Sequence, residues 1–368
     1  MKTKEVHQFS FHELSEKDLK SLKVLDLITK KGIISRTEIS KITGINIVSI
    51  SNYINRYIEE KLIMENGFDV STGGRKPELV ELNKEENRII GIEIGKDLIR
   101  SVFTDIGLSV SSKMEMPKTG RSVKEITAEL CVLIEGMLKK AGITDGGLRT
   151  VGVGTSAYDN EYISKTLRER FGVEVFVADE VSCAAFGERD INKKIPSGDL
   201  LYIYSDIGYG IVVKDTGERI SCSNSKYLCP WNESMGAVNL AKSDVARGVG
   251  TSMVELSGAR MENITVDIIT KAAMGNDEVA LSIMRSVGVS LGLRIAYLVN
   301  LFNPKSVLIG GGIEQAGELI LGPIKKTVKK LSFKDRSGEI NIMPGSLGDE
   351  AVSLGAAFLA AREIFLKA

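Results

Sequence analysis

The chain has 368 residues, of which 48 are Lys or Arg and 48 are Asp or Glu, so its overall charge favours neither a strongly acidic nor a strongly basic partner. A hydrophobic content of 43% and a charged content of 26% are typical of a globular protein, and the length predicts two or three domains. No apolar run approaches the roughly 20 residues that span a bilayer, and residues 1–20 lack the apolar core of a signal peptide. The absence of such a run predicts no membrane partner. Because the four cysteines are scattered as well, we expect a reduced, cytoplasmic protein.

Two helices are predicted at the start of the chain. The first begins at Ser15, which has the spacing of a capping box with Asp18, and ends at Gly32. The second runs from Arg36 to Thr43, and its inward face is expected to carry Ile39 and Ile42.

A third helix is predicted from Asn46 to Glu60, with an inward face of Ile47, Ile50, Ile54 and Ile58. A short helix, a turn with glycine and a second helix form the helix-turn-helix pattern, whose second helix enters the major groove of DNA with its N-terminal half. The residues expected to contact DNA from this unit are Arg36, Asn46, Ser49, Ser51, Asn52 and Arg56. A three-helix interaction module that binds no DNA is the alternative interpretation.

A hairpin from Leu62 to Val80 follows, with its turn predicted at Asn66-Gly67, and it makes the unit a winged one. Within it, the segment from Ser71 to Pro77 combines two glycines and a proline with Arg75 and Lys76, a shape that can enter a minor groove. The alternative is a solvated linker. Residues 1–82 are thus predicted to be a winged helix-turn-helix DNA-binding domain.

From residue 83 onward, strands and helices alternate, which predicts an α/β architecture. A strand, a glycine turn and a second strand occur from Arg88 to Asp105 and again from Leu200 to Lys214, which suggests an internal duplication. We expect one lobe at 83–200 and a second at 201–348, with the final helix (349–368) packing back on the first lobe through a face of Ala and Gly.

Four segments together resemble the ROK family, which is named for repressors, open reading frames and sugar kinases. They are Ser71 to Pro77 with Leu79 to Leu82, Phe171 to Val177 with Ala184 to Glu188, Leu298 to Pro304 with Val307 to Ile313, and Ser346 to Ala351 with Leu354 to Ala357. The resemblance covers nearly the whole chain. It implies an actin-like (ribonuclease H-like), two-lobed ATPase fold, and a role like that of the winged-helix members, which are mostly sugar-sensing transcriptional repressors.

The resemblance also indicates where kinase chemistry would lie. The family's catalytic aspartate, in an Asn-Asp pair, corresponds to Glu180 of the pair Asp179-Glu180, and Asp179 could substitute for it. The positions that would bind a nucleotide are Gly95, Lys96, Gly208, Gly310, Gly311, Gly312 and Gly348. The first two glycine turns depart from the family pattern, and Asp206 would place a negative charge beside phosphate. The later glycines fit either nucleotide binding or tight packing, so ATP and Mg²⁺ are expected only if kinase activity is retained.

The sugar side and the zinc side depart further from the family. The chain runs from Gly154 almost directly into the next helix, without the family's longer sugar-pocket loop, and Ala237 to Leu240 stands where the family has Glu-x-Gly-His. Cys222 and Cys229 lack the spacing of a closed zinc site, so no metal site is predicted.

These observations predict a transcriptional repressor of sugar metabolism that binds an operator in double-stranded DNA, senses a sugar or sugar derivative and has lost kinase activity. The alternatives are an ATP-dependent sugar kinase of the glucokinase or N-acetylglucosamine kinase type, and a scaffold that binds neither sugar nor nucleotide. The resemblance also implies a homodimer or homotetramer. Gly288, Gly292 and Ala296 permit close helix packing, either in such an assembly or in the core.

Overall fold

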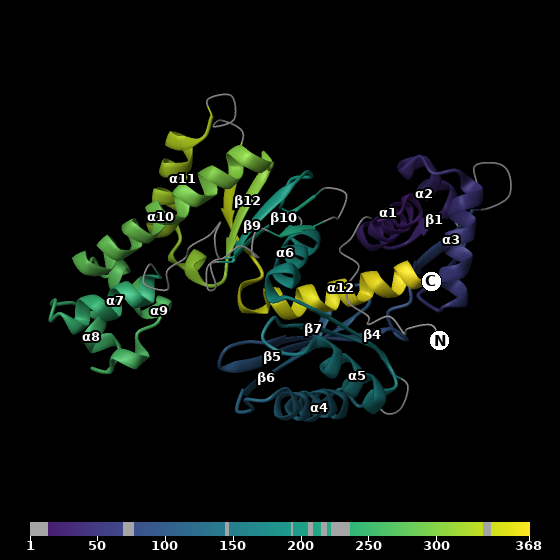
Figure 1. Ribbon diagram of the computed structural model, residues 1–368. Helices are drawn as coiled ribbons and strands as arrows, with labels where there is room; N and C mark the ends of the chain where they lie inside the picture. The colour runs from purple at the N-terminus through teal and green to yellow at the C-terminus, as the bar shows by residue number, and fades with distance from the viewer. Residues whose placement is uncertain are drawn as a thin grey trace. The chain divides into compact units, whose positions relative to one another are not determined.

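The computed structural model describes residues 14–68, 77–143, 147–192, 194–204, 209–214, 219–221, 236–333 and 340–368. The chain divides into two compact units, one formed by residues 1–191 with 350–368 and the other by residues 192–349. The first unit contains an N-terminal head, which we define as α1–α3 with β1–β3, and an α/β part, which we call lobe 1 (Figure 1).

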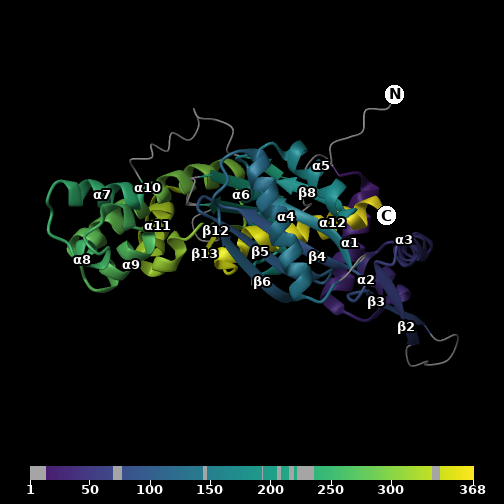
Figure 2. The same cartoon turned by 90° about the horizontal axis from the view of Figure 1, so that it is seen from below.

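The head has three helices and a three-stranded sheet in the order β1-β3-β2, with both pairings antiparallel (Figure 2). Ser15 and Asp18 form the predicted capping box, and Ser35 and Asn46 cap the next two helices. The elements are α1 (Glu16–Lys31), β1 (Ile34–Ser35), α2 (Arg36–Thr43), α3 (Ile47–Glu59), β2 (Ile63–Phe68) and β3 (Glu78–Leu82).

Two local predictions for the head are wrong. Asn66 and Gly67 do not form the hairpin turn; they lie inside β2, where the pairing with β3 is irregular between Glu65 and Phe68. Gly67 has a φ of +68°, so the Asn-Gly pair adapts the strand to a bulge rather than reversing it. Ile42 and Ile47 do not face inward, since 50% and 42% of their surfaces are exposed.

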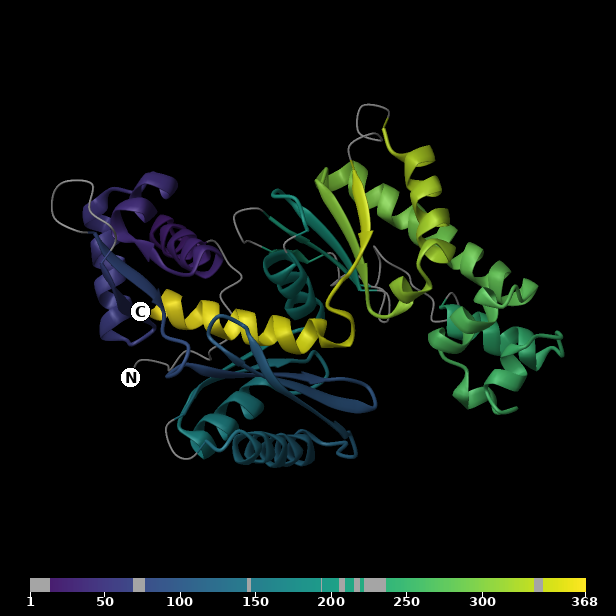
Figure 3. The same cartoon turned by 180° about the vertical axis from the view of Figure 1, so that it is seen from behind.

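Lobe 1 is built on a five-stranded sheet in the order β6-β5-β4-β7-β8. Strands β6, β5 and β4 pair antiparallel, and β4, β7 and β8 pair parallel. Helices α4 and α5 cover one face and α12 covers the other, with α6 packed against α12 (Figure 3). The elements are β4 (Arg88–Ile94), β5 (Leu98–Asp105), β6 (Val110–Pro117), α4 (Val123–Lys140), β7 (Leu148–Gly154), α5 (Asn160–Phe171), β8 (Glu174–Ala178), α6 (Glu180–Ile191) and α12 (Ala351–Lys367).

Helix α12 returns to lobe 1 and packs against it through backbone contacts that exclude a side chain. A Cβ atom added at Gly91 of β4 would lie 2.0 Å from the Ser353 carbonyl oxygen, and one at Gly152 of β7 would lie 2.1 Å from that of Ala356. A Cβ atom at Gly355 would lie 1.7 Å from the carbonyl oxygen of Cys183 in α6. The Ala and Gly face expected from the sequence is therefore the surface that brings α12 against both the sheet and α6.

The second unit repeats the strand pattern of lobe 1. Its sheet has the order β11-β10-β9-β12-β13, with the first three strands antiparallel and the last three parallel. This repetition supports the internal duplication inferred from the two glycine turns. The elements are β9 (Leu200–Tyr204), β10 (Tyr209–Val213), β11 (Arg219–Ser221), α7 (Ala237–Ala246), α8 (Met253–Leu256), α9 (Val266–Met274), α10 (Glu278–Phe302), β12 (Ser306–Gly310), α11 (Glu318–Leu331) and β13 (Asn341–Pro344).

Helix α10 is a core helix of this unit. Added Cβ atoms at Gly288 and Gly292 would lie 2.8 Å from Pro323 Cβ and 2.6 Å from Thr327 Cβ of α11, so these glycines serve packing within the chain. Among the described residues, α10 is long and apolar enough to cross a membrane by length and composition, but half of its most apolar window is buried. That burial is the behaviour of a core helix.

Candidate nucleic-acid interface and kinase-like loops

Helix α3 carries most of the residues predicted to contact DNA. Asn46 caps the helix, because its Oδ1 accepts a hydrogen bond of 2.8 Å from the Ser49 backbone N–H. Ser49 and Ser51 are half-buried, whereas Asn52 is exposed. The structure therefore places Asn52 on the outer surface of the head and gives Asn46 a capping role in addition to its predicted one.

Two of the three arginines predicted to contact DNA, Arg36 and Arg56, have partners within the head. Arg36 donates a hydrogen bond of 2.7 Å to Asn55 Oδ1 in α3, and its Nη2 lies 3.1 Å from Glu78 Oε2 in β3. The Arg56 guanidinium lies over the Tyr53 ring at 5.3 Å. Arg36 thus joins α2 to α3 and the wing strand. The other two predicted cations, Arg75 and Lys76, lie outside the described residues.

The core face of α3 extends into lobe 1 through Tyr57. Its hydroxyl lies 2.5 Å from Ser21 Oγ in α1, and its ring meets that of Phe365 in α12 edge-on, with 5.0 Å between centroids. Burial raises the pKa of Tyr57 to about 12, an effect that the Ser21 hydrogen bond and the Arg56 charge partly oppose. The helix that would lie in the groove is therefore packed, on its opposite side, against the last turns of α12.

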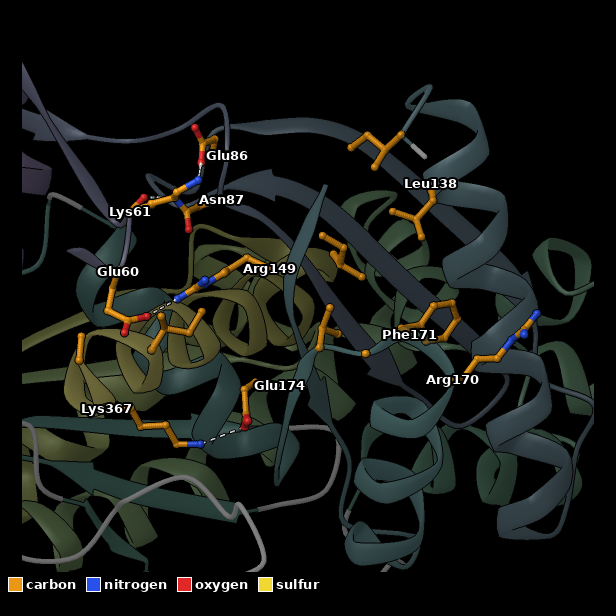
Figure 4. Close-up of a pocket in the computed structure, with 16 residues that line it drawn as sticks. Glu60, Lys61, Glu86, Asn87, Leu138, Arg149, Arg170, Phe171, Glu174 and Lys367 are labelled. Atoms are coloured by element: carbon orange, nitrogen blue, oxygen red, sulfur yellow. Dashed lines mark hydrogen bonds and ion pairs between the residues drawn. The ribbon is translucent and has the colours of Figure 1, made fainter. Parts of the chain in front are cut away.

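A cavity of about 1050 Å³ lies where the head meets lobe 1 (Figure 4). Its cations are engaged in ion pairs, which makes it a poor site for a free anion. Arg149 Nη2 of β7 lies 3.2 Å from Glu60 Oε2 at the end of α3, a pair that joins lobe 1 to the head. The remaining pairs are Lys61–Glu86 at 3.4 Å, Lys367–Glu174 at 3.0 Å and Arg170–Glu135 at 2.7 Å.

A further charged contact on α12 lies near the head. The buried Arg362 guanidinium and the Arg189 guanidinium of α6 lie over the Phe186 ring, at 5.3 Å and 5.0 Å from its centroid. Burial lowers the pKa of Arg362, and the neighbouring Glu363 carboxylate partly offsets this effect.

The two candidate catalytic carboxylates have different roles in lobe 1. Asp179 accepts hydrogen bonds from the Ser182 backbone N–H at 2.9 Å and from Ser182 Oγ at 2.8 Å, so it caps the start of α6. Glu180 is the first residue of α6, and its Oε2 is buried without a hydrogen-bond partner among the described residues. Of the two, Glu180 is the carboxylate that keeps an oxygen without a hydrogen-bond partner in the described part of the chain.

The first glycine turn of lobe 1 is closed on itself. The Gly95 backbone N–H donates to the Leu98 carbonyl oxygen at 3.0 Å, and Lys96 is exposed at the tip of the turn. Just before the turn, the buried Glu93 carboxylate lies 3.5 Å from the Arg100 guanidinium. A phosphate loop needs backbone N–H groups directed at the anion, and here the Gly95 N–H already has an acceptor.

In the second unit, the glycines at the end of β12 divide into two kinds. A Cβ atom at Gly310 would lie 2.2 Å from the Tyr202 hydroxyl, so this position serves tight packing. Gly311 and Gly312 have φ values of +86° and +101°, which favour glycine, and open space surrounds an added Cβ at Gly312. The Gly312 N–H donates to Glu314 Oε2 at 2.8 Å, so a carboxylate occupies this loop.

The remaining predicted positions give less information. Gly348 has a φ of +55° and begins the turn that leads into α12, with open space around an added Cβ. Gly208, Cys222 and Cys229 lie outside the described residues. Within the described part of the chain, no group of three or more His, Cys, Asp or Glu side chains is placed to hold a metal ion.

Comparisons with known proteins agree with this architecture. The model of the ROK family matches residues 247–363. The xylose repressor of Caldicellulosiruptor bescii is 28% identical over 92% of this chain and 94% of its own length. The DNA-binding transcriptional dual regulator NagC of Escherichia coli is 24% identical over 94% of this chain and 93% of its own length.

Solved structures separate the two parts of the chain. A ROK family transcriptional regulator, a homologue of the E. coli MLC protein, superposes with a TM-score of 0.75 at 20% identity, covering 95% of this chain and 96% of its own. A ROK family glucokinase from Streptomyces griseus, solved with glucose and AMPPNP, superposes with a TM-score of 0.64 at 21% identity, covering 74% of this chain and 99% of its own. The fold is thus a winged helix-turn-helix head followed by an actin-like α/β part. Residues 247–363 thus match the ROK family model, and the chain resembles a ROK family regulator in fold over 95% of its length.

Sequence reasoning missed one exposed residue of α3, Val48. Val48 is 67% exposed, and it stands four positions before Asn52 on the side of the helix that faces away from the head's core. The signal was present, because Val48 lies opposite the buried Ile50, Tyr53, Ile54 and Tyr57 at about 100° per residue.

Proposed function

We propose that this chain is a cytoplasmic transcriptional repressor that binds double-stranded DNA through its head and senses a sugar or sugar derivative through its kinase-like part, with kinase activity lost. The observation that carries the proposal is the head itself. It is a capped helix-turn-helix with a wing strand, and its outer helix surface holds an exposed Asn52 above a fully formed core. The similarity to repressors along the whole chain supports the same assignment.

The kinase-like loops support the loss of phosphoryl transfer. Catalysis of that reaction depends on backbone N–H groups, cations and Mg²⁺ that surround the phosphates. Here the Gly95 and Gly312 N–H groups donate to acceptors within the protein, and Glu93 is paired with Arg100. These two N–H groups are therefore not available to donate hydrogen bonds to the phosphates of ATP.

The packing of the head supports a mechanism for sensing. Helix α12 begins directly after the Gly348 turn and ends against Tyr57 of the recognition helix α3. The Arg149–Glu60 ion pair adds a second contact between lobe 1 and the head. A ligand that favours one conformation of lobe 1 would therefore change the position of the head, provided that it binds the two conformations with different affinity.

Fluorescence anisotropy with DNA from upstream of the protein's own gene tests DNA binding. We expect selective binding, which random DNA competes poorly, and an affinity that falls steeply as salt rises, because phosphate contacts release counterions. Binding no stronger than to random duplex would contradict the proposal.

A panel of free sugars added to the protein–DNA complex tests the sensor. The relatives are named for xylose and N-acetylglucosamine, so both belong in the panel together with glucose and their phosphates. We expect one of them to release the DNA at a concentration at which the others do not. If the whole panel leaves the complex intact, a sugar is not the effector.

We also propose that the repressor is a homodimer, assembled through an apolar row on α10 that we call the α10 face. Val289, Leu293, Tyr297 and Leu301 are 41%, 51%, 58% and 60% exposed at a constant spacing of four residues. Leu331 and Phe333 extend the face, since both are exposed and their backbones bond to the Asn300 side chain beside Leu301. Such a row can pair with itself about a two-fold axis, as symmetric dimers require, and further pairing would give a tetramer.

An ATP-dependent sugar kinase is the second candidate, and the buried Oε2 of Glu180 favours it. A carboxylate in that state can accept the proton of a sugar hydroxyl. The test is ATP turnover with Mg²⁺ across hexoses and amino sugars. Turnover that Glu180→Gln abolishes would establish the kinase, and a lack of turnover with every sugar would exclude it.

A further inference from the structure

The outward row of α3 begins with an aliphatic side chain. At about 100° per residue, positions 48, 52, 55 and 59 form one row that lies opposite the buried row of the helix. Of this row, Asn55 accepts a hydrogen bond from Arg36, and Glu59 lies at the C-terminal end of the helix. Val48 and Asn52 are therefore the two residues that would enter a groove first.

The chemistry of the major groove decides what an aliphatic residue can recognise there. Guanine, cytosine and adenine present hydrogen-bonding atoms at that edge, whereas thymine also presents its C5-methyl group. Val48 against guanine or cytosine would bury polar atoms without a partner, which is unfavourable. Against thymine it would bury two apolar surfaces, which is favourable.

Asn52 adds a neighbouring contact of matching chemistry. At the major-groove edge of adenine, N7 accepts a hydrogen bond from the NH₂ of a side-chain amide, and the N6 amino group donates one to the amide oxygen. Only adenine offers an amide this pair of contacts. Four helical positions correspond to about 6 Å along the axis, and stacked bases are about 3.4 Å apart. The two contacts would thus fall one or two base pairs apart.

We propose that Val48 recognises a thymine C5-methyl group and that Asn52 recognises an adenine one or two base pairs away, so that each head reads a short A·T step in the major groove. This inference rests on the proposed function, and it assigns the base specificity of the same surface. Ile47 is 42% exposed on the neighbouring flank of α3, which widens the apolar surface beside Val48.

Base analogues test the Val48 contact with the full-length chain. Each thymine in a selectively bound duplex is replaced singly by deoxyuridine, which pairs identically and lacks the methyl group. Because one buried methyl contributes roughly 0.8 kcal/mol, we expect one thymine in each half-site whose replacement weakens binding about fourfold. In Val48→Ser the same replacement should have no effect, since the methyl group then has no apolar partner.

Replacement of adenine by 7-deazaadenine, which lacks the N7 acceptor, tests Asn52 in the same way. We expect a loss on the order of tenfold at one adenine, and no such loss in Asn52→Ala. Val132→Ser is the matched control, because Val132 is 63% exposed on α4 of lobe 1 and should leave both analogue effects unchanged.

The outcomes separate this inference from the function on which it rests. Selective binding that is indifferent to every thymine methyl, or a methyl effect that survives in Val48→Ser, overturns the Val48 assignment and leaves the repressor proposal standing. An adenine effect that survives in Asn52→Ala overturns the Asn52 assignment. If no duplex binds better than random DNA, the repressor proposal and this inference both fail.

Discussion

Helices α12 and α10 are both long, apolar and glycine-containing, but they are covered differently. Nearly every residue of α12 from Ala351 to Phe365 is buried, against lobe 1 and, at Phe365, against Tyr57 of the head. Helix α10 is buried on the side that holds Gly288 and Gly292, while its α10 face is exposed. Both helices use glycine to approach a neighbour within the same chain.

The comparison shows that small residues spaced four apart do not by themselves indicate an interface between chains. Gly288, Gly292 and Ala296 lie at a spacing that suits either an assembly or a core, and in α10 the two glycines belong to the core. The residues that remain for a partner are the next ones along, Val289, Leu293 and Tyr297. A small-residue row thus indicates close packing, whereas an exposed apolar row indicates what is left unpacked.

The largest effect is expected where α12 touches α6. The Cβ atom of Gly355→Ala would lie 1.7 Å from a backbone carbonyl oxygen, which no side-chain rotation relieves, so we expect a loss of about 3 kcal/mol or more in the free energy of unfolding. Urea denaturation measures it. Gly136→Ala in α4 is the matched control, because its Cβ would meet only the Met114 side chain at 3.5 Å; it should be neutral or stabilising. Equal stability of the two variants would contradict the close packing of α12.

The α10 face gives the next largest effect. Leu293→Glu with Tyr297→Glu places two like charges on each side of the proposed two-fold interface, and we expect the dimer dissociation constant to rise on the order of 100-fold. Sedimentation equilibrium measures it. Val132→Glu changes a single exposed valine of α4 and should leave the association unchanged. If the double variant remains as dimeric as the parent, the interface lies elsewhere.

A substitution on the glycine-containing side of α10 should lower the stability of the fold and leave the association of two chains unchanged. Gly292→Ala brings a Cβ atom to 2.6 Å from Thr327 Cβ, a contact that a small shift of α11 can partly relieve, so we expect a loss of about 1 to 2 kcal/mol. Gly250→Ala has open space and an ordinary φ, so it should be neutral. Thermal unfolding followed by circular dichroism compares them. A Gly292→Ala protein that melts like the parent but dissociates would reverse the roles of the two faces.

Much of the fold could be predicted because local chemistry determines it. The capping box at Ser15 and the stop at Gly32 place α1 within a residue of its ends. The prediction of a turn at Asn66-Gly67 was wrong because the pairing of β2 with β3 overrides a local turn preference. The prediction that Ile47 faces inward was wrong because Tyr53 and Tyr57, which carry polar groups, fill part of the core face of α3. A row of isoleucines alone was expected to occupy that face.

The candidate site was less accessible to sequence reasoning. The resemblance puts the base position at Glu180 and lets Asp179 substitute for it, whereas only the hydrogen bonds to Ser182 show that Asp179 is a cap. Likewise, Gly310, Gly311 and Gly312 look alike in sequence. The proximity of Tyr202 to Gly310 and the positive φ of the other two distinguish them, and both are properties of the fold.

The smallest effect is expected at the C-terminal end of α12, where Phe365 meets Tyr57. Because the pKa of Tyr57 is raised from 10 to about 12 in the folded protein, its stabilising contribution is complete below pH 10 and is lost as pH rises towards 12. By pH 11 this lowers the free energy of unfolding by about 1 kcal/mol. Urea denaturation at pH 9 and pH 11 measures it, and Tyr57→Phe should lose about 1 kcal/mol less than the parent between these two values.

Tyr53→Phe, for which the ring is retained and the Lys17 carbonyl contact of 3.2 Å is lost, is the control and should follow the parent. An identical pH response in the parent and Tyr57→Phe would mean that the Tyr57 hydroxyl reaches solvent, and the junction between α12 and α3 would then be looser than the edge-on contact with Phe365 implies.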